Sequence, residues 1–463
     1  MVIRKFYETW LPSLLVCLAA GTAGAQSFRV QCPTSTTLHP TSGPSAPGAI
    51  KCQQISGGDG FATMADGHQI FLFGFGPLSG LQDIQNGAPG TQLATTFNNV
   101  GDPNGAVVDP ASIMNTGVLN AQSPAPLMAI DEDDEFFLTL TNVGMIMRPD
   151  LFEQHTVHFH GYPNASSFFD GVPDASVAIN IGGSFTYYYT APDAGTYFWH
   201  CHISPPEHLQ MGMVGQLYVR PRQDRLSAGS NLYAALRTAN TLKGTTGLGC
   251  ADLLCTGQTP LPAADNGFTQ GSNGYTKYAY NDGDGSTRYD VEYPIQIMGF
   301  DPNFHFVGTT FNPEGFADMK DKYFLLSGRG YPDTVNASYI STEASDGVSR
   351  PSQPMRSLIT IPHNGRALLR ISDLSVTEFS TLATIGIPMQ VIANNARLLR
   401  DLKGNNLYYK TNSVTLGGGE SIDVILDANG IPSGTYFLYT TNLDHLSNDA
   451  ENFGGQMTEI VVQ

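Results

Sequence analysis

Basic residues are scarce in this chain. Its 463 residues include 23 lysines and arginines against 41 aspartates and glutamates, which gives a formal net charge of −18 at pH 7. A strongly acidic protein repels both the phosphates of nucleic acids and the anionic surface of a membrane. We therefore expect no nucleic acid partner and no association with an anionic membrane surface.

Long hydrophobic runs are also missing. The apolar stretch at residues 11–25, LPSLLVCLAAGTAGA, is short and rich in glycine and alanine, whereas a membrane-spanning helix needs about 20 mainly apolar residues. The stretch follows Arg4 and Lys5 and ends in small residues, as an export signal with its cleavage site does. We expect residues 1–25 to be a signal peptide, the chain to have no membrane span, and the protein to be exported, periplasmic or extracellular.

Cysteine is rare, and the number left after the expected signal peptide is odd. The chain has six cysteines, one of them within residues 1–25. Export permits disulfides, and the spacing suggests the pairs Cys32–Cys52 and Cys250–Cys255. Cys201 is then left over. An unpaired thiol in an oxidising compartment is either a metal ligand or a buried, inert side chain, and the count alone does not separate the two.

Helical periodicity is rare as well, and strand-like runs dominate. These runs are separated by turn residues, and the chain contains 50 glycines and 29 prolines. The pattern favours antiparallel β architecture, and the length leaves room for two or three domains. After the signal peptide we expect a loop-rich N-terminal extension (26–124), a compact β domain (125–225), a loop-rich linker (226–290) and a second β domain (291–463).

One short run is strongly acidic. The sequence DEDDE, Asp131–Glu135, stands directly before a strand-like run. Carboxylates of this density could bind a hard cation. An exposed acidic turn is the simpler interpretation, and we expect that.

Histidine, by contrast, is concentrated. Six of the eleven histidines lie in HTVHFHG, residues 155–161, and in YFWHCHISPPEHLQMGM, residues 197–213. Successive side chains of a β-strand point to opposite faces. A strand through the second segment therefore places His200 and His202 on one face and Cys201 on the other. Such a strand can contact two different metal sites at once.

The cysteine face has the ligand types of a blue copper site. Two imidazoles and a thiolate in a plane, with a weak thioether above it, form a type 1 copper centre. His155, which has the opposite parity to the other two histidines of its segment, can meet Cys201, and His208 supplies the second imidazole. Met213 is the expected axial ligand. Met211 competes for that role, and we expect it to pack in the core instead.

The opposite face carries imidazoles only. An all-imidazole site suits copper or zinc. We expect a second metal site built from His158, His160, His200 and His202.

A repeat connects the two β domains. The sequence GTYF occurs at 195–198 and again at 434–437, each time just before the last strand of its domain. In this frame the ligand triplet 200–202 corresponds to Tyr439, Thr440 and Thr441. The second domain is therefore expected to keep the strand without metal ligands.

With these residues the chain resembles the multicopper oxidase (laccase-like) family of the cupredoxin superfamily. The resemblance covers about residues 125–463 and rests on HFHG, DGVPDASVAINIGGSFTYYY, GTYFWHCH and HLQMGMVG, while residues 364–399 look like the copper-free middle domain of such enzymes. It implies an all-β fold of two cupredoxin-like Greek-key β-sandwich domains. It also implies electron transfer from type 1 copper, through Cys201 and its flanking histidines, to a copper cluster that reduces dioxygen.

The chain departs from the family pattern in its histidine count. A full trinuclear cluster in this family takes eight histidines, and this chain shows four of them. The other histidines contain no second HxH pair: His39, His68, His305, His363 and His445. The spacing from Cys201 to His208 is longer than in laccases and is similar to that of copper nitrite reductases.

Three hypotheses remain open. A second copy of the chain could complete the cluster across a two-fold axis. Alternatively, the enzyme is similar to nitrite reductase, and a neighbouring subunit supplies His305, His363 or His445 to a single copper site. In the third, the protein is an electron carrier or an assembly protein. Of these, we expect an exported copper oxidoreductase that acts on a small reductant or redox protein and on oxygen, with a homo-oligomer as the arrangement that would complete the second copper site.

Overall fold

The computed structural model describes most of the chain after the expected signal peptide. The described residues are 29–98, 100, 109–162, 166–191, 193–226, 277–307, 315–401, 405–452 and 454–463. The signal peptide and the expected Cys250–Cys255 disulfide lie outside these ranges. So does most of the expected linker.

The first sheet of the first sandwich has the strand order β2-β1-β5-β7, and the short β3 pairs with β1. β1 runs parallel to β5, and the other neighbours are antiparallel. The strands are β1 (Ile50–Thr63), β2 (Gln69–Pro77), β3 (Gln92–Leu93), β5 (Glu135–Gly144) and β7 (Ser184–Thr190). The N-terminal segment therefore contributes half of this sheet.

The expectation of a loop-rich extension at 26–124 is thus wrong for its central part. Glycine-rich sequence is typical of loops, but in β1 and β2 the glycines lie where another backbone approaches closely. A Cβ added to Gly60 would lie 2.8 Å from the backbone nitrogen of Ala121, and one added to Gly76 would lie 2.3 Å from the carbonyl oxygen of Asn120. Two short helices, α2 (Leu81–Gln85) and α3 (Pro110–Gly117), complete this segment.

The second sheet of this sandwich carries the histidine segments. Its order is β4-β9-β8-β6, formed by β4 (Met128–Asp131), β9 (Val214–Arg220), β8 (Gly195–His200) and β6 (His158–Phe159). β6 pairs with β8 so that His158 is opposite His200 and Phe159 is opposite Trp199. The two histidine segments, about 40 residues apart in sequence, therefore meet as neighbouring strands. A short helix, α4 (Pro205–Gln210), follows β8.

The second sandwich has an aliphatic core between two sheets. One sheet contains β12 (Val291–Phe300), β13 (Tyr323–Leu326), β17 (Arg366–Asp373), β19 (Met389–Asn394), β20 (Arg397–Leu398), β21 (Tyr409–Thr411), β23 (Ser421–Asp427), β25 (Ser447–Asn448) and β26 (Glu451–Asn452). The other contains β16 (Ile359–Ile361), β18 (Ser380–Thr384), β22 (Ser413–Leu416), β24 (Gly434–Thr440) and β27 (Met457–Val462). Outside them lie β10 (Lys277–Tyr278), β11 (Arg288–Tyr289), β14 (Ile340–Glu343), β15 (Ser349–Gln353) and α6 (Pro302–Val307).

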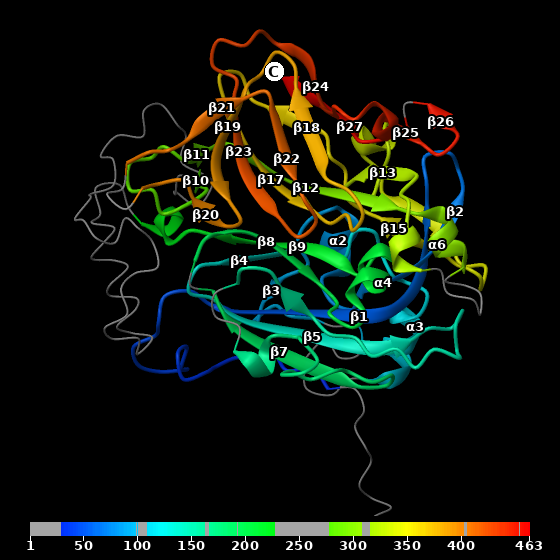
Figure 1. Cartoon of the computed structure of the whole chain (residues 1–463). Helices are drawn as coiled ribbons and strands as arrows, with labels where there is room; N and C mark the ends of the chain where they lie inside the picture. Colours follow the sequence, from blue (N-terminus) through cyan, green and yellow to red (C-terminus); the bar gives the residue numbers. More distant parts are fainter. Residues whose placement is uncertain are drawn as a thin grey trace, which may run out of the picture.

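The two sandwiches pack against each other through the strand that precedes Cys201. β8 contacts both β17 and β23. The Thr196 hydroxyl donates to Asp423 Oδ1 at 2.6 Å, and the Ser421 hydroxyl donates to the carbonyl of Thr196 at 2.6 Å. Figure 1 shows the first sandwich in blue to green in the lower half and the second above it in yellow to red. The expected all-β fold of two β-sandwich domains is confirmed.

The acidic run before β5 is not an exposed turn, and that expectation is wrong. Glu132, Asp133 and Asp134 are buried. Asp133 forms ion pairs with Arg222 and with Arg225. Burial of these carboxylates is tolerated because the arginines and backbone amides satisfy them.

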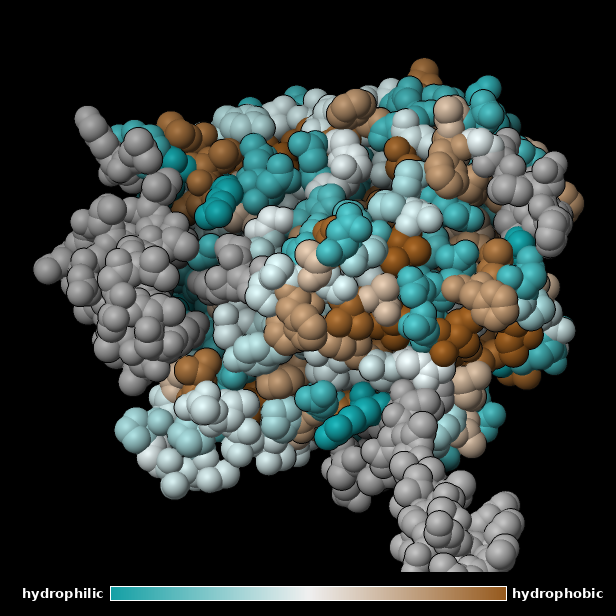
Figure 2. All heavy atoms as spheres, turned by 60° about the horizontal axis from the view of Figure 1, so that its bottom comes forward, coloured by the Kyte–Doolittle hydropathy of each residue, from teal (hydrophilic) through white to brown (hydrophobic). Residues whose placement is uncertain are grey.

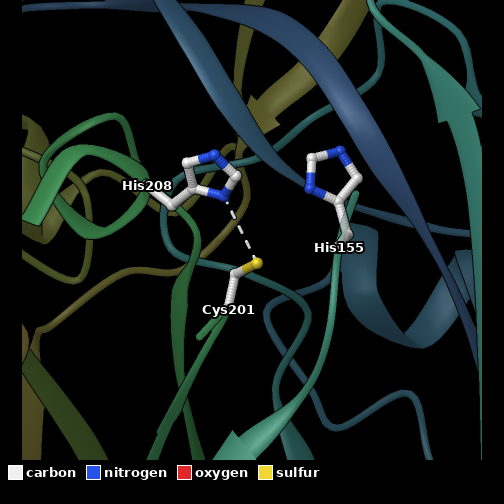
Figure 3. A group of neighbouring side chains, drawn as sticks. All are labelled: His155, Cys201 and His208. Atoms are coloured by element: carbon white, nitrogen blue, oxygen red, sulfur yellow. Dashed lines mark hydrogen bonds between the residues drawn. The ribbon is translucent and has the colours of Figure 1, made fainter. Parts of the chain in front are cut away.

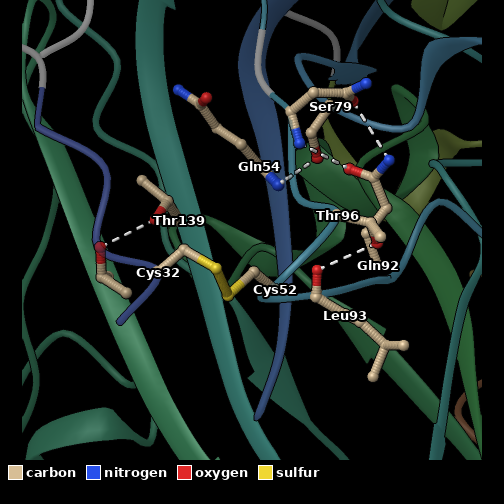
Figure 4. Close-up of a disulfide and its surroundings, with 10 residues drawn as sticks. Cys32, Cys52, Gln54, Ser79, Gln92, Leu93, Thr96 and Thr139 are labelled. Atoms are coloured by element: carbon tan, nitrogen blue, oxygen red, sulfur yellow. Dashed lines mark hydrogen bonds between the residues drawn. A yellow bond between two sulfur atoms is a disulfide. The ribbon is translucent and has the colours of Figure 1, made fainter. Parts of the chain in front are cut away.

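The Cys32–Cys52 disulfide is present, as expected, with a sequence separation of 20. It connects the segment before β1 to β1 itself, beside Thr139 of β5 (Figure 4). Cys201 is the one unpaired cysteine of the described residues, and it is buried.

The described part of the chain contains no helix that is long and apolar enough to cross a membrane. Figure 2 shows one face, on which hydrophobic and hydrophilic residues are intermixed and the brown residues gather in several separate groups.

Candidate metal centre

One candidate site lies between the two sheets of the first sandwich. The ligand atoms of His155, Cys201 and His208 all lie within 4.8 Å of one another, and the three residues are buried. His155 forms an isolated bridge with Ile179, Cys201 directly follows β8, and His208 lies in α4. His208 Nδ1 is 3.3 Å from the sulfur of Cys201, and His155 faces the sulfur from the other side (Figure 3). The structure therefore brings together the three residues expected in the plane of a type 1 site.

The two histidines of this site are arranged as metal ligands are. His208 Nε2 lies 3.4 Å from a carboxylate oxygen of Glu153. A carboxylate beside the outer ring nitrogen is a common partner of metal-ligating histidines and fixes the orientation of the ring. Both ring nitrogens of His155 are buried without a hydrogen-bond partner. Such buried, unpartnered nitrogens are costly unless a metal ion satisfies one of them.

The thiol of Cys201 is held in the form that binds metal. Burial alone would raise its pKa, but the neighbouring His208 and His155 rings hold the pKa of Cys201 well below its usual range. The backbone amide of Thr156 also points at the sulfur, at 3.4 Å. The thiolate is the ligating form of cysteine, so the site favours a soft metal ion.

Met213 lies beside this site. Its carbonyl accepts from the amide of Cys201 at 3.1 Å, and its amide donates to the carbonyl of His208 at 2.8 Å. Met211 is buried in the same core. The axial role of Met213 stays a prediction, because Met211 and Met213 belong to the same buried core as Cys201.

β1 closes the site on the side of His155. A Cβ added to Gly57 would lie 2.7 Å from Cδ2 of the His155 ring, and the ring of Phe73 on β2 meets His208 edge-on with centroids 6.0 Å apart. Our reading of the sequence missed Gly57, Phe73 and Glu153. The first two lie in the segment that we expected to be an extension, and Glu153 carries no signal other than its closeness to His155 in the chain.

A second candidate site lies on the other face of β8. The ligand atoms of His158, His160 and His200 lie within 4.8 Å of one another. His202 stands beside this group, with its ring centroid 4.7 Å from that of His158 and 5.1 Å from that of His200. The four histidines expected on one face are thus neighbours. The ligand atoms of His158, His160 and His200 form one group, and His202 lies beside this group.

Burial favours the neutral form of three rings of the second site, His160, His200 and His202. Burial, together with the neighbouring histidines, lowers the pKa of His200 to about 3. Burial also lowers the pKa of His160 and of His202. Neutral imidazole is the ligating form of histidine, so this face can accept a cation at neutral pH.

The structure places the other histidines away from both sites. His305 is buried, and its ring nitrogens face the carbonyl oxygens of Phe71 and Gln210. His445 is buried and stacks on Phe324, with Nε2 2.8 Å from Glu378 Oε2. Neither ring is presented at the surface of the chain.

The fold and the two sites define a class of protein: a two-sheet β-sandwich with a Cys-His₂ centre joined to an imidazole cluster through one strand. Residues 107–224 match the family model described as multicopper oxidase. This part of the chain is therefore similar to the multicopper oxidase family.

The curated relatives resemble the same part of the chain. Laccase abr2 of Aspergillus fumigatus is 33% identical over 109 residues, 23% of this chain and 17% of the relative. Laccase-1 of Emericella nidulans is 34% identical over 132 residues, 27% of this chain and 19% of the relative. The matches thus span less than a fifth of the length of these relatives.

Solved structures extend the likeness of the fold to most of the chain. The blue copper oxidase from Nitrosomonas europaea has a TM-score of 0.53 and 19% identity, and the match covers 89% of this chain and 85% of that chain. The multicopper oxidase mgLAC has a TM-score of 0.53 and 16% identity, over 89% of this chain and 86% of that chain. At this identity the likeness concerns the fold.

Copper is the cofactor that the family implies, and the residues present fit it. A buried thiolate with two imidazoles is the donor set of a blue copper site, and imidazoles alone suit a second copper ion. The unpartnered nitrogens of His155 support this fit.

Proposed function

We propose that the chain is a copper-dependent oxidoreductase of multicopper oxidase type. In this proposal His155, Cys201, His208 and Met213 hold a type 1 copper ion, and His158, His160, His200 and His202 form the second copper site. Copper supplies one-electron chemistry by cycling between Cu(I) and Cu(II). The reductant is a small molecule or a redox protein, and oxygen is the acceptor, taking up electrons and protons to leave as water.

One observation carries the proposal: the two candidate sites share one short stretch of backbone. The sulfur of Cys201 faces His155 and His208, while the residues bonded to Cys201 on either side belong to the imidazole face. His200 Nδ1 also lies 2.6 Å from the carbonyl oxygen of Cys201. The thiolate and the imidazole cluster are therefore connected by a few covalent bonds and one hydrogen bond, an arrangement suited to passing single electrons.

Export is part of the proposal. A signal peptide at residues 1–25 and a periplasmic or extracellular location agree with the Cys32–Cys52 disulfide, because structural disulfides persist in oxidising compartments.

The alternatives differ in what completes the second site. In the version similar to nitrite reductase, a neighbouring subunit of a homo-oligomer supplies one histidine. Burial of His305 and His445 leaves His363, which is exposed, for that role. In the version without catalysis, the type 1 site carries electrons or copper, and the imidazole face is not a reaction site.

The test compares the copper-loaded wild type with Cys201→Ser. We expect the wild type to show an intense blue charge-transfer band and to consume oxygen when a phenolic or metal-ion donor is added. The variant should lose both while its circular dichroism stays native. His68→Gln, an exposed histidine outside both sites, serves as the control and should keep both.

A blue band that persists in Cys201→Ser would refute the ligand assignment. A blue wild type that transfers electrons to a partner without consuming oxygen would favour the carrier over the oxidase.

A further inference from the structure

We infer that His158, His160 and His200 form a self-contained mononuclear site for one transition-metal ion, copper above all. One coordination position is left for a small oxygen ligand such as water, dioxygen or a small oxyanion. The family pattern instead implies half of a trinuclear cluster. This inference deepens the function proposed above and rests on it for the identity of the metal.

The ring protons of the three histidines point away from a common centre. His158 Nδ1 lies 2.7 Å from the carbonyl oxygen of Asp170, and His200 Nδ1 lies 2.6 Å from that of Cys201. A carbonyl only accepts hydrogen bonds, so in both rings Nδ1 carries the proton and Nε2 carries the lone pair. Metal-ligating histidines are oriented in this way, with the second nitrogen donating to a backbone carbonyl.

His160 is held in the same way by the second sandwich. Its ring also hydrogen-bonds to the backbone of Gly419. A Cβ added to Gly419 would lie 2.8 Å from His160 Nδ1, so only glycine allows this approach. Each of the three rings therefore has a backbone partner of its own, from three different segments of the chain.

The remaining nitrogens then face one another. His160 Nε2 and His200 Nε2 are 3.1 Å apart. One proton can occupy this contact, and its position depends on the tautomer of His160. A cation bound by both nitrogens takes the place of that proton, and His158 completes a set of three imidazoles whose ligand atoms lie within 4.8 Å of one another. Three histidines with one open position are typical of a site that binds and activates a small ligand.

The histidines of the chain do not provide a trinuclear cluster. All eleven histidines lie within the described residues. The positions of the second sandwich that correspond to the ligand triplet are Tyr439, Thr440 and Thr441. Where the second sandwich meets His160 it presents the glycine turn at 417–419 and no imidazole. His202 lies beside the converging group rather than in it.

The experiment measures copper per chain by elemental analysis, together with the visible and EPR spectra, for the full-length protein loaded with Cu(II). We expect one blue copper and one further, EPR-visible copper. His160→Gln should lose the second copper and keep the blue band, which also reports that the variant is folded. His68→Gln, an exposed histidine outside both sites, is the control and should keep both ions.

A second copper that His202→Gln removes as completely as His160→Gln does would overturn the inference. So would a stoichiometry above that of the two sites, or a wild type that takes up blue copper alone. Cys201→Ser separates this inference from the proposed function: if the variant is colourless and still binds the second copper, the mononuclear site stands by itself. If the wild type shows no blue band, the proposed function fails. The copper content and the EPR spectrum then still show whether the three histidines bind one ion.

Discussion

Gly57 is the residue at which the ring of His155 meets β1. A side chain there would contact the ring at 2.7 Å, and one on the adjacent Gly58 would contact Val143 at 2.8 Å on the opposite face of the strand. The two glycines therefore carry similar steric constraints, and only Gly57 borders the candidate copper site.

We predict that Gly57→Ala displaces His155, shifts the blue band and weakens copper binding. Overpacking of this kind costs about 1–3 kcal/mol, so both Gly57→Ala and the control Gly58→Ala should lower the free energy of unfolding by similar amounts. Visible spectroscopy and copper titration of the two variants measure the difference. Equal spectra for the two variants would show that Gly57 does not position the ligand.

The alternation of side chains along a strand correctly predicted the side on which Cys201 lies. It placed Cys201 opposite its two flanking histidines, and the structure brings Cys201 to His155 and His208. It did not separate His202 from the converging group, because the strand ends at His200 and alternation no longer fixes the direction of the next side chains.

Among the elements, β1 connects the most parts of the first sandwich. It pairs with β2, β3 and β5, and its Gly57 borders the metal centre. The Cys32–Cys52 disulfide connects the segment before β1 to the start of β1, near Thr139 (Figure 4). A cross-link that closes a loop of this length stabilises a protein mainly by restricting the unfolded chain.

We predict that replacing both cysteines by serine lowers the free energy of unfolding by about 3 kcal/mol, measured by urea denaturation. The blue spectrum of the folded protein should stay unchanged, because neither cysteine contacts the site. Wild type with the disulfide reduced should match the variant. A variant as stable as the oxidised wild type would show that this link does not stabilise the fold.

At the scale of the whole molecule, a buried ionic network connects the two sandwiches. Glu292 on β12 pairs with Arg220 of β9 at 2.7 Å and with Arg370 of β17 at 3.1 Å. Burial alone would raise the pKa of Glu292, but the two arginines lower it from 4.5 to about 2. The carboxylate therefore stabilises the folded protein at all pH values above its unfolded pKa. This contribution is lost as the pH falls through about 2.

We predict that Glu292→Gln lowers the free energy of unfolding by about 3 kcal/mol near neutral pH, because it removes one of the two carboxylates, Glu292 and Asp423, that pair with the buried Arg370. The difference in unfolding free energy between wild type and variant should be constant above pH 4.5 and should shrink between pH 4.5 and about 2. Urea denaturation across this range provides the measurement. A difference that does not change with pH would contradict the lowered pKa of Glu292.

The sequence by itself determined the local chemistry of this protein: which residues can ligate copper, which side of a strand each one takes, and that strands rather than helices carry them. These properties follow from residue type and from the two-residue period of a strand, both of which are local. Tertiary structure alone decided that glycine-rich residues 50–77 are buried strands, that the acidic run at 131–135 pairs with arginines, and that a glycine turn of the second sandwich meets His160. Those outcomes depend on contacts between segments up to several hundred residues apart, and no local pattern encodes such contacts.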